Sequence, residues 1–440
     1  MPPPLSRHKT IDPRPSPCFN KIKSFAKNPD WKGPGMYRVS PFVRRFAQAL
    51  LAGIGLATLW VNLAPDSYYD ALEWRLYDLN LPAWLAPLPT SLTPMLIVSH
   101  LLMPFFVAFI GKELWEALIL TRGAMSGRRA IAPVAGVMGA AVGASLIWVL
   151  TSALIETAEE ASFGLGWQVP VGGDVVLAYF TARAVFGPGH PALHLSLLLT
   201  IGLDILGLVL GGLADPQATL RLAWLLLPLV ACLLVWLAIA RPPRPGTRVT
   251  EAQHRRAMAL WPYVLTGAAS WFGVAASGLP PALGLLPVIA VIPHADHSFG
   301  VFAEAEAFLH DPLNRLAHLL VKPLAVVLFL FGLTRGGIDL QAFAPTTLTT
   351  LAALWLGKPL GLMLGLALAA RVFGVALPEG FRPRDIALVA LIVGMGFTVP
   401  ALVLENALPG GGMTEAARLG LALSLLAGPL AILLSRAGRR

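Results

Sequence analysis

The stretch "PALHLSLLLTIGLDILGLVLGGLAD", residues 191–215, decides the fold class, because it is a long apolar run with one carboxylate, Asp204, near its middle. The whole chain is 56% hydrophobic and only 13% charged, with a mean hydropathy of +0.69. Soluble globular chains do not have this composition, so the sequence indicates a polytopic membrane protein. A carboxylate at membrane depth costs about 2.5–3.5 kcal/mol on insertion scales, so Asp204 needs a functional or structural explanation.

A helix needs about 20 mostly apolar residues to cross a hydrocarbon core of roughly 30 Å. Runs of this kind recur through most of the chain, and we predict an all-α polytopic fold with about twelve transmembrane helices. The twelve predicted spans are residues 46–64, 93–117, 129–153, 169–186, 191–213, 220–240, 257–274, 276–293, 315–337, 349–372, 386–404 and 416–436.

Basic residues fall on one side of the membrane if the chain alternates through twelve spans, and short basic loops stay preferentially cytoplasmic. Both termini are therefore predicted to be cytoplasmic. The net charge of +9 lies in these segments, which favours contact with anionic membrane lipid over nucleic acid. Residues 1–45 are basic and lack an apolar core, which predicts a largely disordered arm before the transmembrane domain at 46–440. Cys18 and Cys232 offer neither a disulfide framework nor a CxxC metal site.

Two predicted spans contain helix breakers. The segment "WQVPVGGD", residues 167–174, places a proline and two glycines before Asp174, and "VGMGFTVP", residues 393–400, interrupts a later span. Each break falls in the middle member of a three-span group, spans 3 to 5 and spans 10 to 12. Broken helices in matching positions of two halves are typical of transporters that bind an ion at the membrane midplane.

Four ionisable residues in the predicted spans stand out: Glu113, Asp174, Asp204 and Lys358. Asp204 and Lys358 are interpreted as partners in an ion or proton site, or alternatively as a buried ion pair that only fixes two helices together. Asp174 either contacts an ion or caps a broken half-helix, and the two roles are compatible.

Several segments resemble consecutive landmarks of the NhaA family of bacterial sodium/proton antiporters, in order from about residue 46 to 436. They are "HLLMPFFVAFIGKELWEALILTRGAMSGRRAIAPV", "GWQVPVGGDVVLAYFTARAVFG", "LTIGLDILGLV", "DPLNRLAHLLVKPLAVVLFLFGLTRGGIDL", "LGKPLGLMLGLALAARVFGVALPEG" and "GMGFTV". The resemblance implies an inverted repeat with crossed, broken fourth and eleventh helices. It also implies exchange of sodium or lithium for protons at the bacterial inner membrane.

The resemblance also assigns roles to positions. It places the aspartate of the fourth-helix break at Asp174, the lysine of the tenth helix at Lys358 and the glutamate ending the second helix at Glu113. Gly173 and Thr398 lie in the two breaks and are expected to support the site.

Three positions depart from the family pattern. The second of two adjacent aspartates in the fifth helix falls on Ile205, an aspartate of the second helix on His100, and a glutamate before the ninth helix on Ala317. With Asp204 as the remaining carboxylate of that pair, exchange of one proton per cation, or a different substrate, becomes plausible. His100 is a candidate proton relay, with a hydrogen-bonded core histidine as the ordinary alternative.

The sequence thus predicts an antiporter in which a proton and a monovalent cation, most readily Na⁺, compete for Asp204. Lys358 would compensate charge in the empty state. Glu113, His294, His297 and His310 are candidates for pH sensing, the histidines standing in a loop that a solvated role also explains. No cofactor, resident metal or enzymatic activity is expected, and a homodimer is a candidate assembly.

Two other classes of protein match parts of the sequence. A non-transporting sensor or scaffold, or a fold with an altered substrate, is the alternative that Ile205 favours. An intramembrane aspartyl protease would need a GxGD motif and a second aspartate, whereas Val171 stands at the first glycine position of "VGGD".

Overall fold

The structure, a computed structural model, describes most of the chain after residue 41. The described residues are 42–79, 82, 85, 88–119, 127–156, 164–188, 190–215, 219–240, 257–294, 302, 311–375 and 381–437. Within them the chain is almost entirely helical, apart from a two-stranded antiparallel sheet of β1 (Tyr77–Asp78) and β2 (Ser91–Leu92). The predicted arm lies outside the described residues up to position 41, and the first helix of the described part begins at Phe42.

Eight helices in the described part of the chain are long and apolar enough to cross a membrane, and two bent pairs bring the number to ten. The polytopic all-α prediction is therefore confirmed. The eight are Phe42–Leu63 (α2), Pro94–Leu118 (α4, η2 and α5), Gly127–Ile155 (η3 and α6), Pro191–Leu213 (α8), Leu222–Ile239 (η5, α9 and η6), Pro312–Arg335 (α13), Pro345–Phe373 (α14, η9 and α15) and Gly412–Ala437 (α18 and α19).

The remaining helices are shorter. The bent pairs are Gly164–Val171 (η4) with Val175–Phe186 (α7), and Pro383–Val393 (α16) with Thr398–Ala407 (α17). Outside the spans, α3 (Pro65–Glu73) follows α2. The segment between α9 and α13 contains α11 (Trp261–Ala276), η7 (Pro281–Leu283) and α12 (Leu286–Ile289).

The predicted seventh and eighth spans differ from the structure. The seventh is α11, with 16 residues, and the eighth contains only the three-residue η7 and the four-residue α12. Residues 276–293 are apolar but include four prolines. Each proline removes a backbone donor, so hydropathy alone overstates the helical length here.

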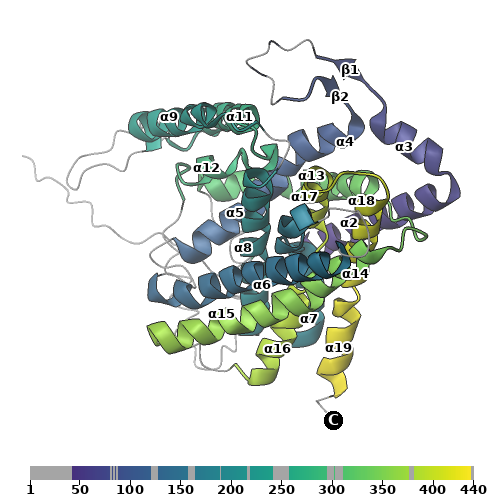
Figure 1. The fold of residues 1–440 in the computed structure, drawn as a ribbon. Coiled ribbons are helices and arrows are strands. Elements are labelled where there is room, and N and C mark those ends of the chain that lie inside the picture. The colour runs from purple at the N-terminus through teal and green to yellow at the C-terminus, as the bar shows by residue number, and fades with distance from the viewer. Residues whose placement is uncertain are drawn as a thin grey trace, which may run out of the picture.

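Both predicted breaks are present, and their residues explain them. The first pair bends by 51° and the second by 46°. Asp174 caps the start of α7 with an extended backbone, and its side chain accepts the N–H of Leu177. The second break follows Gly394, where α16 ends. The long helices before them, α6 and α15, lie side by side, as Figure 1 shows.

Glycines allow α6 (Ile131–Glu156) and α15 (Lys358–Phe373) to pack backbone against backbone. A Cβ added to Gly139 would lie 2.9 Å from the Cα of Gly365, and one added to Gly143 would lie 2.8 Å from the Cα of Gly361. Small residues of this kind let membrane helices approach closely, where no hydrophobic effect drives them together. This seam fixes the helix that carries Lys358 at its first residue.

Candidate functional site

Asp174 joins the two broken helices. It is fully buried, and its Oδ1 accepts the N–H of Leu177 in α7 at 2.8 Å. Its Oδ2 accepts two donors from Thr398, the first residue of α17: the N–H at 3.2 Å and the hydroxyl at 2.5 Å. The N-terminal ends of two half-helices, each with a positive partial charge, thus converge on one carboxylate. Asp174 therefore acts as a cap for both half-helices.

Asp204 and Lys358 meet the first break from two other helices. Both side chains are fully buried, Asp204 in α8 and Lys358 at the start of α15. The Oδ1 of Asp204 accepts the N–H of Gly173 at 2.7 Å, while the ammonium of Lys358 donates to the carbonyl of Gly172. Consecutive residues of the unwound chain therefore supply a donor to the acid and an acceptor to the base.

A direct ion pair between Asp204 and Lys358, the alternative interpretation of these two residues, is not formed. Among the described residues, no ion pair within 4.0 Å joins the two side chains. The reason is that the break exposes main-chain groups, and each charged side chain uses one of them. The Oδ2 of Asp204 has no hydrogen-bond partner in the described structure. A buried carboxylate oxygen without a donor is a suitable ligand for a proton or a hard cation.

Ile205, the neighbour of Asp204, faces a different environment. It is half-buried and lines a cavity of about 240 Å³ between α5, α8 and α12. The other lining residues are Gly111, Leu114, Trp115, Leu118, Ile119, Leu286 and Ile289. Where the resemblance places a second aspartate, this chain therefore has an apolar wall.

Other predicted residues lie away from this centre. His100 lies in η2 (Ile97–Leu102), and its carbonyl accepts the indole N–H of Trp271 at 2.7 Å. In the described structure its imidazole has no hydrogen bond to Asp174, Asp204 or Lys358, so it is not a direct relay partner in this conformation.

Glu113 belongs to a buried cluster near the other end of the same span. Lys112 forms ion pairs with Glu113 at 3.1 Å and with Glu116 at 3.0 Å, and the three side chains are almost fully buried. The Oε2 of Glu113 also accepts the backbone N–H of Phe302 at 2.6 Å. Glu113 thus binds Phe302, which stands between His297 and His310 in the sequence.

Of those histidines, only His294 is in the described structure, where its Nε2 accepts the indole N–H of Trp115 at 3.3 Å. His297 and His310 lie outside the described residues.

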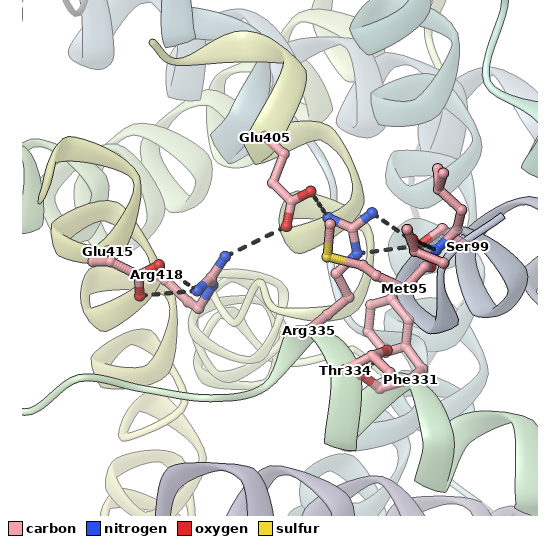
Figure 2. A network of polar contacts seen from close by, with 10 residues as sticks. Met95, Ser99, Phe331, Thr334, Arg335, Glu405, Glu415 and Arg418 are labelled. Atoms are coloured by element: carbon pink, nitrogen blue, oxygen red, sulfur yellow. Dashed lines mark hydrogen bonds and ion pairs between the residues drawn. The ribbon is translucent and has the colours of Figure 1, made fainter. Parts of the chain in front are cut away.

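Sequence reasoning missed a second charged network, shown in Figure 2, which consists of Ser99, Arg335, Glu405, Glu415 and Arg418. It was missed because charges at span ends are usually solvated, and these residues end or begin predicted spans. One local signal was available: Glu415 and Arg418 stand three residues apart, a spacing that pairs charges on a helix.

Two broken helices that meet at buried carboxylates and a buried lysine define a secondary transporter for a small ion. A family model described as Na⁺/H⁺ antiporter 1 matches residues 44–434. The chain belongs to this family, and the resemblance to NhaA is confirmed.

Relatives match almost end to end. The Na⁺/H⁺ antiporter NhaA of Jannaschia sp. (strain CCS1) is 36% identical over 91% of this chain and 98% of its own length. The Na⁺/H⁺ antiporter NhaA 2 of Pelobacter propionicus is 31% identical over 90% of this chain and 96% of its own. Among solved structures, the sodium proton antiporter MjNhaP1 from Methanocaldococcus jannaschii is 16% identical, with a TM-score of 0.42, and covers 89% of this chain and 99% of its own.

Proposed function

We propose that this protein exchanges Na⁺, with Li⁺ as a second substrate, for protons across the bacterial inner membrane, with both termini in the cytoplasm. Membership of the Na⁺/H⁺ antiporter 1 family supports the reaction. One observation carries the assignment of the site. Asp204 is buried at a helix break and has one oxygen, Oδ2, without a donor.

The proposed mechanism is competition at that oxygen. A proton on Asp204 neutralises it, whereas Na⁺ requires the deprotonated carboxylate and further oxygens, which unwound backbone carbonyls supply. One carbonyl is already in place, because Gly172 presents its oxygen to Lys358. A cation that binds this carbonyl would displace the ammonium of Lys358. Cation binding therefore disfavours the charged form of the lysine.

Asp174 has a different role in this proposal. Its two oxygens already accept three hydrogen bonds from α7 and α17. It therefore holds the crossed half-helices in place and balances the buried positive charge, while Asp204 binds a proton or the cation in turn.

A second candidate function follows from Ile205. The apolar cavity beside it provides no carboxylate ligand where the family has one, which favours an altered substrate or a non-transporting sensor. The two candidates differ in whether the wild-type protein moves protons when Na⁺ is added.

Proton flux in proteoliposomes distinguishes them. A pH-sensitive dye reports the flux while Na⁺, Li⁺ and K⁺ are added in turn to the wild type, Asp204→Asn, Ile205→Asp and, as a matched control, Asp66→Asn in the exposed part of α3. Antiport predicts a Na⁺ response in the wild type and in Asp66→Asn, and none in Asp204→Asn. A response that survives in Asp204→Asn would refute the assigned site. A silent wild type with an active Ile205→Asp would favour the second candidate.

A further inference from the structure

The second charged network ties α17 to the helices around it. Arg335, the last residue of α13, forms an ion pair with Glu405 of α17. Arg418 of α18 lies 3.5 Å from the other oxygen of Glu405. Figure 2 shows Glu405 between the two guanidinium groups. One carboxylate therefore links the neighbouring helices α17 and α18 to α13, which lies far from them in sequence.

Each arginine also binds a second partner besides Glu405. Arg335 donates through Nε and Nη2 to the hydroxyl of Ser99 at 3.1 and 2.9 Å, and Ser99 donates in turn to the carbonyl of Met95 at 2.9 Å. Arg418 pairs with Glu415 of its own helix at 2.7 Å. Arg335 and Arg418 are only 5% and 7% exposed, so they cannot simply turn to solvent when Glu405 leaves. The two arginines and two glutamates are balanced in charge.

The position of Glu405 on α17 determines which end of this half-helix the network holds. Thr398 begins α17 and binds Asp174, and Glu405 follows seven residues later. Seven residues are close to two helical turns, so both side chains lie on nearly the same face, about 10 Å apart along the axis. The half-helix α17 is thus held at its start by the ion-site break and near its end by the arginines.

Ser99 and Glu113 lie 14 residues apart on one span, so the network sits about 20 Å from the Glu113 cluster, near the opposite end of the helix bundle. Above it lies α3. Tyr68 of α3 donates its hydroxyl to the carbonyl of Leu333 at 3.1 Å. Burial raises the pKa of Tyr68 to about 12, so its hydroxyl stays a neutral donor over the physiological range.

We propose that Glu405, held between Arg335 and Arg418, is a latch that keeps α17 seated, and that the exchange cycle includes opening this latch. The inference rests on the proposed function, because it assumes that the broken helices move between two states. A buried charge that loses its partner is strongly unfavourable. The latch therefore closes one end of the bundle until the arginines are hydrated, and Glu405 is a positioning residue that never touches the ion.

The test measures the accessibility of α17 directly and needs no transport. Ala407, two residues beyond Glu405 and 3% exposed, is replaced by cysteine in the full-length Cys18→Ser/Cys232→Ser background. The rate of reaction with a polar maleimide is measured in lipid nanodiscs. Adding Glu405→Gln is expected to raise this rate at least tenfold. Adding Glu73→Gln instead, which removes an exposed carboxylate of α3 outside the network, is expected to change it less than twofold.

A conservative variant guards against a trivial loss of folding. Glu405→Asp keeps a carboxylate between Arg335 and Arg418 and is expected to hold the rate within threefold of the parent. An unchanged rate in Glu405→Gln, or a rate raised equally by Glu73→Gln, would overturn the latch. Failure of the proposed function is distinct, because it would appear as silent Na⁺-dependent proton flux while the labelling rates still differed.

Discussion

Replacing Thr398 by valine isolates one hydrogen bond at the crossing of the broken helices. The change keeps the β-branched shape and the backbone N–H bond to Asp174 at 3.2 Å, but removes the hydroxyl bond at 2.5 Å. A hydrogen bond to a charged group contributes about 1.5–3 kcal/mol, and a buried acceptor that loses its donor costs the upper part of that range. Since Asp174 is fully buried, we expect the free energy of unfolding to fall by about 2–3 kcal/mol.

The assay is denaturant unfolding in mixed micelles, followed by tryptophan fluorescence, for the wild type, Thr398→Val and Thr398→Ser. Serine retains the hydroxyl, so it is expected to lose less than half of what valine loses. Equal losses in the two variants would refute the reasoning, because the missing methyl group or a shifted backbone would then explain the effect. Proton flux should fall in the same order, since Asp174 holds α7 and α17 in register.

Three further changes test other parts of the structure. Gly173→Ala places a Cβ 2.8 Å from the Cγ2 of Thr200, so the break must shift, and Na⁺-dependent proton flux should fall at least tenfold in proteoliposomes. Gly361→Leu places a Cβ 2.8 Å from the carbonyl carbon of Gly139, and overpacking should lower unfolding stability by about 3 kcal/mol or more, seen as loss of monodisperse protein on gel filtration. For Tyr68 the pKa rises from 10.0 to about 12 on folding, so the stability it contributes is complete below pH 10 and is lost as the pH rises through 12. The melting temperature should therefore fall over this interval, and fall less in Tyr68→Phe.

The sequence predicted the broken helices well, because their signals are local. Proline and glycine before Asp174 disrupt the helix wherever they stand, and an aspartate after them is a natural cap. The placement of Lys358 and Asp204 near that break also followed from the sequence. What each of them binds did not, because their partners are the carbonyl of Gly172 and the N–H of Gly173. Main-chain groups become available only through the local fold, and the residue type at a position does not reveal whether its main-chain groups are free to bind.

The missed charged network and the wrongly predicted eighth span have other causes. The latch joins residues 99 and 335 to the neighbouring residues 405 and 418, and no local pattern links positions 99 and 335 with each other or with that pair. The eighth span failed for the opposite reason. Its apolar composition satisfies a hydropathy window, whereas its prolines, four within residues 276–293, limit the helices to single turns.

The main-chain contacts at the first break bear on how such a site can evolve. Every residue has a carbonyl, and every residue except proline has an N–H. The groups that hold Lys358 and Asp204 therefore need no side chain at positions 172 and 173, where a Cβ would not fit, while side-chain ligands elsewhere can be gained or lost one at a time. Ile205 stands next to Asp204 without disturbing the bond to Gly173. A backbone scaffold of this kind can retain its shape while substitutions in the side-chain ligands around it change which ion binds.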